Sequence, residues 1–386
     1  MPYIRVERLP VQVLGLGLLG FDHLQIVFRS DFGTGSTTRQ DDWFVIEGIR
    51  EPSEMGTRLA VEGWHGGTTL SDANGGLMGQ ALTARIGAAE SRGDRDIADG
   101  GEAVMLWATL ASYAADIEAQ KFPYIAAALP GSTLPTLNSS SLVASLLHHA
   151  GVDIDAAMPS GLRFSPGTTT LLGTSQDDDL RTGNGFVSLL AGDGDDVLSG
   201  SDNRIEKLYG GRGNDTFRWS GGDNILHGGQ PGLAYADDGI DTVDYTGAGA
   251  IAIEALPAGE PHVHADFIVT HRFGRDRLFS IEEIIWDATS DRVVLGEGVG
   301  LASPPRVNSR SGDAAERGGE QAGGLEILSD PVLEQHDAVQ GYENAEDAFA
   351  LDMIDAALLS LDPLDDPLSA FDGALLFTVP ELHTAG

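Results

Sequence analysis

Three aspartates recur at nearly equal distances in the middle of the chain, each within a glycine-rich stretch. Asp178, Asp196 and Asp215 are separated by eighteen and nineteen residues, and an apolar residue follows each of them two positions later. A period near eighteen corresponds to two nonapeptides, which make one full turn of a parallel β-roll, so the three carboxylates are expected to stack along one edge. Stacked carboxylates and nearby backbone carbonyls supply the hard oxygen ligands that Ca²⁺ prefers.

The residues around these aspartates fit the same chemistry. Glycines allow successive backbone carbonyls to turn toward one cation, because they adopt positive φ without steric cost. Two further segments, 221–229 and 239–247, look like degenerate copies whose aspartates are again eighteen residues apart. The sequence therefore predicts a set of calcium-binding residues, namely Asp178, Gly192, Asp193, Gly194, Asp196, Gly210, Gly211, Gly213, Asp215, Asp223 and Asp241.

The opposite edge of such a roll has a poorer sequence. Val187 stands where an aspartate is expected, and residues 200–208 are irregular, so calcium sites are predicted mostly on one edge. The alternative is that these Asp-Gly segments are only turns of an ordinary sheet protein. Turns alone need no common register, which favours the calcium interpretation.

Residues 210–218, "GGRGNDTFR", match every fixed position of the nonapeptide G-G-x-G-x-D-x-U-x. The region therefore resembles the RTX (repeats-in-toxin) family. The resemblance implies a calcium-binding β-roll, export through the type I secretion machinery by an uncleaved C-terminal signal, and an extracellular location. The acidic and apolar sequence after Arg317, the last lysine or arginine, is similar to such a signal.

Composition limits the partners of the chain. Its 386 residues carry a formal net charge of −36, from 59 acidic and 23 basic residues, which argues against nucleic acid or an anionic membrane and favours cations. The absence of cysteine excludes disulfides and thiolate chemistry. The apolar run at 11–21 is too short and too rich in glycine to span a bilayer, so no transmembrane segment is expected.

A second group of residues that could do chemistry lies near the N-terminus. "FDHLQIVF" at 21–28 places His23 at the start of an expected strand, and "LNSSSL" at 137–142 places Ser139 at the start of an expected helix. This order resembles the circularly permuted papain-like hydrolases and acyltransferases of the lecithin:retinol acyltransferase type. The resemblance implies His23 as general base, Glu47 as the residue that orients it, and Ser139 at the nucleophile position, where the family has cysteine.

Structural roles compete with this catalytic interpretation. Asn138 and the serines after it are ordinary residues for a helix N-terminus, and His23 could form a polar pair at a strand edge. The other histidines give weaker signals. His65 lies in a glycine-rich loop, the pair at 148–149 ends a helix, and His262, His264 and His271 fit the surface of a capping sheet.

The expected organisation follows from these segments. Residues 1–160 should form an α+β domain of papain-like type, with strands at 22–30 and 41–48 and helices at 101–120 and from Ser139. The first helix should bury Val104, Trp107, Ala108 and Ala111. Residues 165–250 should form the parallel RTX β-roll, 251–300 a β-rich cap, 301–330 a linker, and 331–386 a largely irregular acidic tail that carries the secretion signal.

Two functions remain open from the sequence. The first is a secreted calcium-binding RTX protein whose N-terminal domain hydrolyses an amide or ester bond of an extracellular substrate. The second is a non-catalytic secreted RTX protein that binds or adheres to a surface ligand. In both, Ca²⁺ is the cofactor.

Overall fold

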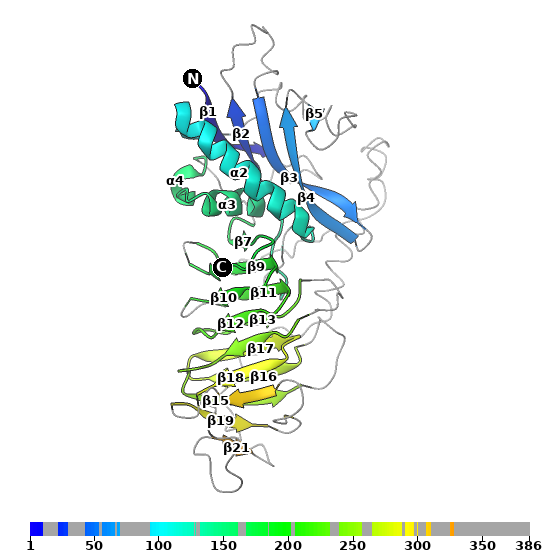
Figure 1. The fold of residues 1–386 in the computed structure, drawn as a ribbon, viewed down its shortest axis with the longest axis vertical. Helices are drawn as coiled ribbons and strands as arrows, with labels where there is room; N and C mark the ends of the chain where they lie inside the picture. The colour runs from blue at the N-terminus through cyan, green and yellow to red at the C-terminus, as the bar shows by residue number, and fades with distance from the viewer. Residues whose placement is uncertain are drawn as a thin grey trace, which may run out of the picture. The chain divides into compact units, whose positions relative to one another are not determined.

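The structure is a computed structural model, and it shows a mostly β protein with an N-terminal antiparallel sheet, few helices and a run of parallel strands (Figure 1). Apart from Ser132, the residues it describes belong to one compact unit that spans 1–128 and 133–334. The described residues are 1–10, 22–29, 43–53, 56–65, 68–69, 93–126, 128, 132–160, 167–183, 185–201, 205–231, 239–256, 265–287, 290–296, 299, 306–309 and 325–327. The expected tail at 331–386 and the residues His262 and His264 lie outside them.

The N-terminal sheet has six antiparallel strands in the order β5-β4-β3-β2-β1-β6. The strands are β1 (Tyr3–Pro10), β2 (Asp22–Arg29), β3 (Trp43–Ser53), β4 (Gly56–His65), β5 (Thr68–Thr69) and β6 (Gly93–Asp99). The two strands expected from the sequence are therefore present as β2 and β3. Alternation along them puts Leu24, Ile26 and Ile46 on one face, where they join a core with the helices.

In the described part of the chain, three helices accompany this sheet: α2 (Gly100–Gln120), α3 (Ser139–His149) and α4 (Ile154–Ala157). Both long helices occur where the sequence predicts them, but the predicted buried face of α2 is largely wrong: Trp107 packs against the core, where its ring stacks on Phe28, and the other three residues do not. Val104 is 41% exposed, and Ala108 and Ala111 are exposed as well. The fully buried residues of α2 are instead Ala103, Leu110, Ala114, Ile117 and Gln120, a face that tertiary contacts define.

Helix α3 is buried along almost its whole length. Every residue of 139–147 is buried, and the helix contacts β2 and β3 of the N-terminal sheet as well as β7 of the parallel region. A helix without a polar face belongs in the interior of a protein, which explains its small and apolar sequence "SSSLVASLL".

The parallel region contains two sheets. The first sheet has the order β20-β18-β14-β12-β10-β8, and all its neighbouring strands are parallel. Its strands are β8 (Asp179–Arg181), β10 (Val197–Ser199), β12 (Thr216–Arg218), β14 (Thr242–Asp244), β18 (Glu283–Trp286) and β20 (Arg306–Ser309).

The second sheet has the order β21-β19-β15-β16-β17-β13-β11-β9-β7 and is parallel except where β16 pairs with its two neighbours. Its strands are β7 (Thr170–Leu172), β9 (Ser188–Asp193), β11 (Lys207–Arg212), β13 (Ile225–His227), β15 (Ala250–Ala255), β16 (Phe267–His271), β17 (Gly274–Phe279), β19 (Arg292–Leu295) and β21 (Leu325–Ile327). The chain alternates between the two sheets from β7 to β14, as a repeat of two short strands requires.

One apolar core lies between the two sheets. Leu180, Leu198 and Phe217, which follow the repeated aspartates by two positions, are buried there against residues of the second sheet such as Leu189 and Leu208. The apolar position of the repeat thus faces the interior, as the sequence predicts.

The expected linker at 301–330 contains two strands. β20 pairs in parallel with β18, and β21 pairs with β19, so both continue the parallel sheets as edge strands. Val307 of β20 is 4% exposed and belongs to the core between the sheets. The Ser, Gly and charged residues around these short strands conceal them in the sequence, which is why a linker is predicted for the whole stretch.

Candidate functional site

The repeated aspartates lie next to one another in the structure. Each stands immediately before a strand of the first sheet, and each backbone N–H donates a hydrogen bond to the carboxylate of the next turn. Asp178 N donates to Asp196 Oδ1 at 2.7 Å, Asp196 N to Asp215 Oδ1 at 2.9 Å, and Asp215 N to Asp241 Oδ1 at 2.8 Å. Asp241 N donates to Glu282 Oε2 at 3.0 Å. We call these five residues the carboxylate ladder.

The centre of the carboxylate ladder is withdrawn from solvent. Asp196, Asp215 and Asp241 are 1%, 0% and 0% exposed. Burial raises the pKa of the Asp196 carboxyl to about 8, and the charges of Asp215 and Asp178 add to the increase. Asp196 Oδ2 is buried and has no hydrogen-bond partner among the described residues. A buried carboxylate oxygen in such a position is costly unless a proton or a cation neutralises its charge.

Glycine backbones form the loops that precede these aspartates. Gly192, Gly194, Gly211 and Gly213 have φ angles of 112°, 134°, 121° and 116°, a region that residues with a side chain rarely adopt. A β-carbon at Gly211 would collide with the carbonyl oxygen of Gly192, and one at Gly213 with that of Gly194. The loops therefore stack closely, with the carbonyl oxygens of one loop against the backbone of the next.

Position 210 requires glycine for a different reason. A β-carbon there would overlap the Asp215 carboxylate, so Gly210 makes room for the carboxylate of its own loop. The structure thus brings together the predicted residues of the three loops that end at Asp178, Asp196 and Asp215. These residues are Asp178, Gly192, Gly194, Asp196, Gly210, Gly211, Gly213 and Asp215.

A second, exposed ladder runs beside the first and is not predicted from the sequence. Asp195 N donates to Asp177 Oδ1 at 2.9 Å, Asn214 N to Asp195 Oδ1 at 2.8 Å, and Ile240 N to Asn214 Oδ1 at 2.9 Å. The hydrogen bonds from Asn214 lower the pKa of Asp195. The signal was the Asp or Asn that directly precedes each repeated aspartate at 177, 195 and 214.

Two predicted ligands lie away from the carboxylate ladder. Asp193 is at the end of β9, and its carboxylate lies 4.0 Å from Arg212. Asp223 precedes a strand of the second sheet, where its Oδ1 accepts a hydrogen bond of 2.8 Å from Arg275 N. Asp223 and Asp241 are therefore on opposite edges, and their eighteen-residue spacing is misleading. Twenty-six residues separate Asp241 from Asp215, its true neighbour in the ladder.

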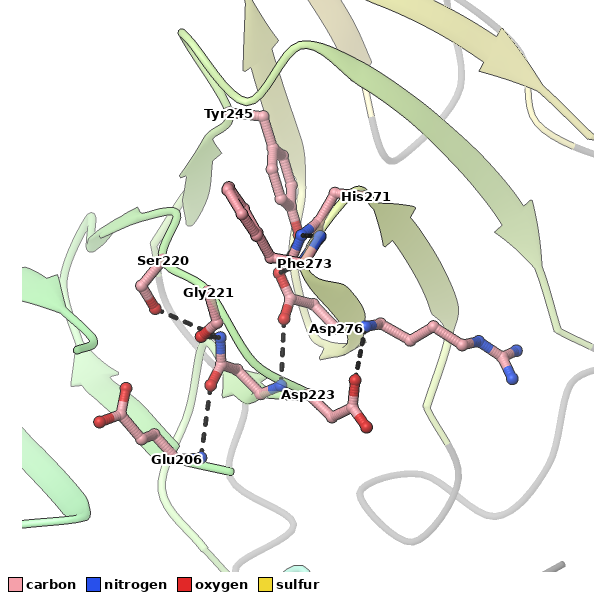
Figure 2. A network of polar contacts seen from close by, with 10 residues as sticks. Glu206, Ser220, Gly221, Asp223, Tyr245, His271, Phe273 and Asp276 are labelled. Atoms are coloured by element: carbon pink, nitrogen blue, oxygen red, sulfur yellow. Dashed lines mark hydrogen bonds and ion pairs between the residues drawn. The ribbon is translucent and has the colours of Figure 1, made fainter. Parts of the chain in front are cut away.

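The opposite edge of the parallel region consists of the loops that precede the strands of the second sheet. Polar groups there form hydrogen bonds with other protein groups (Figure 2). Glu206 N donates to Asn224 Oδ1 at 3.3 Å, and Asn224 N donates to Asp276 Oδ1 at 3.0 Å. Asp276 Oδ2 accepts a hydrogen bond of 2.8 Å from the Tyr245 hydroxyl and lies 3.2 Å from His271 Nε2. Both oxygens of this buried carboxylate thus have protein donors, so this edge does not need a cation.

The tautomer of His271 follows from its other contact. Phe273 N donates to His271 Nδ1 at 3.3 Å, so the ring proton of the neutral imidazole is on Nε2 and faces Asp276. His271 is 6% exposed and belongs to the interior of the parallel region. It therefore contributes a structural contact in place of the surface position that the sequence suggests.

The residues of the papain-like interpretation are only partly brought together. His23 Nε2 lies 2.8 Å from Glu47 Oε2, and Glu47 is 1% exposed, so these two form the expected pair. Ser139 packs against the residue after Glu47, because a β-carbon at Gly48 would lie 3.0 Å from its Cα and 3.3 Å from Leu142. Adjacent residues of a strand face opposite sides of the sheet. Glu47 and His23 therefore lie on the face opposite Ser139.

The N-terminus of α3 shows what its polar residues do instead. Asn138 Oδ1 accepts a hydrogen bond of 2.8 Å from Ser140 N, and Asn138 N donates to Ser141 Oγ at 3.2 Å. This is a capping box, a common way to satisfy the first backbone groups of a helix. Ser139, which is 5% exposed, is the first helical residue inside this cap.

The pair of His23 and Glu47 belongs to a row of polar side chains on its face of the sheet. Gln25 is 1% exposed and donates from Nε2 to Glu7 Oε2 at 2.9 Å. Burial raises the pKa of the Glu7 carboxyl, and the hydrogen bond from Gln25 opposes this effect. The sequence alone gives no sign that Glu7 and Gln25 join the pair, because the row is formed by strand register.

The described residues contain no cluster of three or more histidine, aspartate or glutamate side chains arranged to hold a metal ion. Among the described helices, none is long and apolar enough to cross a membrane. Comparison of the chain with protein-family models, with curated proteins and with solved structures returns no match.

Proposed function

We propose that the chain is a calcium-binding protein of the RTX type, whose parallel region is a β-roll that binds Ca²⁺ along the carboxylate ladder. The observation that carries this proposal is the buried Asp196 carboxylate, which has one oxygen bonded to the neighbouring backbone and the other without a hydrogen-bond partner among the described residues. Calcium accepts carboxylate and carbonyl oxygens at flexible distances, and both lie in the stacked glycine loops.

The contrast between the two edges supports calcium at one of them. On the opposite edge, Asp276 receives hydrogen bonds or close contacts from Asn224, Tyr245 and His271. No comparable donors meet Asp196 Oδ2 in the described part of the chain. The sites are therefore assigned to the carboxylate ladder alone.

Calcium would also control folding. Without a cation, the ladder places several carboxylates side by side in a chain of net charge −36, and their repulsion opposes the compact state. The free energy of calcium binding then becomes free energy of folding. This behaviour suits export through a type I secretion machinery in a calcium-poor, unfolded state and folding outside the cell, as the resemblance to RTX proteins implies.

For the N-terminal domain we propose a non-catalytic binding or adhesive role. The papain-like mechanism requires a base within hydrogen-bond reach of the nucleophile. The placement of Ser139 and His23 on opposite faces of one sheet removes that geometry, so the hydrolase alternative is not the one we favour.

Calcium titration of the full chain tests the proposal with a matched pair of variants. Asp215→Asn removes a ladder carboxylate and should weaken calcium binding by about tenfold or more, because it removes a ligand. Asp223→Asn makes the same chemical change at an exposed carboxylate of the opposite edge and should leave calcium stoichiometry and affinity intact. Absence of binding by the wild-type chain at millimolar calcium, or equal losses in both variants, would refute the assignment.

A further inference from the structure

The second glycine loop, residues 191–196, touches the end of helix α2. Gln120 is the last residue of that helix and is 6% exposed, on the same face as Leu110 and Ile117. Its Oε1 accepts a hydrogen bond of 2.7 Å from the backbone N–H of Asp193. A helix of the N-terminal domain thus contacts the backbone of a candidate calcium loop directly.

This contact occurs where the strand ladder ends on one side. The pairing of β9 with β11 continues to Asp193 and Arg212, whereas the pairing of β9 with β7 stops at Leu190 and Leu172. On the β7 side, the backbone of the loop therefore lacks a strand partner at Asp193. The Gln120 side chain supplies the acceptor that a longer β7 would provide.

The amide of Gln120 lies close against the loop. A β-carbon at Gly192 would be 2.8 Å from Gln120 Oε1 and 2.8 Å from the carbonyl oxygen of Thr174. The glycine is therefore required by the helix contact as well as by its φ angle of 112°. Any larger residue would displace the Gln120 amide from the loop and clash with the Thr174 carbonyl.

The hydrogen bond also fixes the direction of one carbonyl. The N–H of Asp193 and the C=O of Gly192 belong to the same planar trans peptide, so they point in opposite directions. Holding the N–H toward Gln120 turns the Gly192 carbonyl toward the third loop, where it meets the backbone of Gly211. Gly192 belongs to the loop at 191–196, and the last residue of this loop is Asp196 of the carboxylate ladder.

We propose that Gln120 is a positioning residue for the calcium site between the second and third loops, because it orients the Gly192 carbonyl toward the ion. The inference rests on the proposed calcium function. It gives the N-terminal domain an indirect part in calcium binding, through a side chain that lies 73 residues before Asp193 in the sequence. Gln120 does not itself contact the ion.

The test compares calcium titrations of the full-length chain and three variants. Gln120→Met keeps a long unbranched side chain and removes the acceptor, whereas Gln120→Glu keeps an acceptor oxygen. Ala111→Met places the same methionine on the exposed face of α2 as a control. Gln120→Met should weaken calcium binding by about five- to tenfold, the size of one hydrogen bond, while Ala111→Met should stay within about twofold of the wild type. Gln120→Glu keeps the acceptor and adds a negative charge near the cation, so it should not weaken calcium binding.

A second measurement separates positioning from general packing. With terbium in place of calcium, loss of an oriented carbonyl should add water to the bound ion, which shortens the luminescence lifetime in H₂O relative to D₂O for Gln120→Met only. Wild-type affinity and lifetime in Gln120→Met would overturn the inference while leaving the calcium function in place. If Gln120→Met folds poorly, Gln120→Glu decides, since weaker calcium binding by Gln120→Glu than by the wild type would also overturn the inference. A wild-type chain that binds no calcium would remove both proposals.

Discussion

The Ser145 hydroxyl accepts a hydrogen bond of 2.9 Å from the backbone N–H of Leu172. Leu172 lies in β7, the terminal strand of the second sheet, and its carbonyl oxygen is 2.7 Å from His149 Nε2. Both backbone groups are therefore bonded to side chains of α3. Exposed edge strands invite unwanted pairing, and here a buried helix protects the edge. The helix that the sequence offers as the carrier of a nucleophile thus closes the start of the parallel region.

Replacement of Ser145 should destabilise the folded chain. Ser145→Ala leaves the buried N–H of Leu172 without its acceptor, which should lower the free energy of unfolding by about 1–3 kcal/mol. Urea denaturation in saturating calcium measures this. Ser112→Ala, on the exposed face of α2, is the matched control and should change stability by less than about 0.5 kcal/mol. Equal stability of the two variants would show that α3 does not protect the edge.

Acidification should stabilise the folded chain in the absence of calcium, because protons also neutralise the ladder carboxylates. The pKa of Asp196 is raised from 3.8 to about 8 by burial and by its neighbouring carboxylates. The folded, calcium-free chain therefore binds a proton between these pH values that the unfolded chain releases. The contribution of Asp196 to stability is therefore greatest below pH 3.8 and declines as the pH rises from there to about 8.

Circular dichroism in the presence of a chelator measures this dependence. The calcium-free chain should be more folded at about pH 5 than at about pH 8. Asp196→Asn, which cannot titrate, should make the dependence shallower over the same range. A calcium-free chain that becomes more folded as the pH rises would contradict the burial of the ladder carboxylates.

Substitutions of His23 and Ser139 should differ in their effect on stability, and neither residue should be needed for a hydrolytic activity. His23→Ala removes the contact to the buried Glu47 carboxylate and should cost about 1–3 kcal/mol of stability. Ser139→Ala and Ser139→Cys should leave the stability nearly unchanged, and neither the wild type nor Ser139→Cys should hydrolyse a panel of esters and amides. Turnover that disappears in Ser139→Ala would restore the nucleophile interpretation.

Where the repeat is regular, the local sequence was sufficient to predict where its residues lie in the fold. Asp178, Asp196 and Asp215 could be placed on one edge because each turn contains eighteen or nineteen residues, so equal positions recur at equal heights. Where the spacing changes, the same rule fails. The interval of 26 residues before Asp241 disguises its place in the ladder and makes Asp223 look equivalent to it.

The sequence by itself determined the glycine loops, the repeated carboxylates and the apolar positions between the sheets, because each depends on residues a few positions apart. Only the tertiary structure decided which groups meet across the fold. The alternation of β3 separates Ser139 from His23, and the end of β7 leaves room for Gln120 at the backbone of Asp193. These relations depend on strand register and on contacts between distant segments, and a local sequence pattern contains neither.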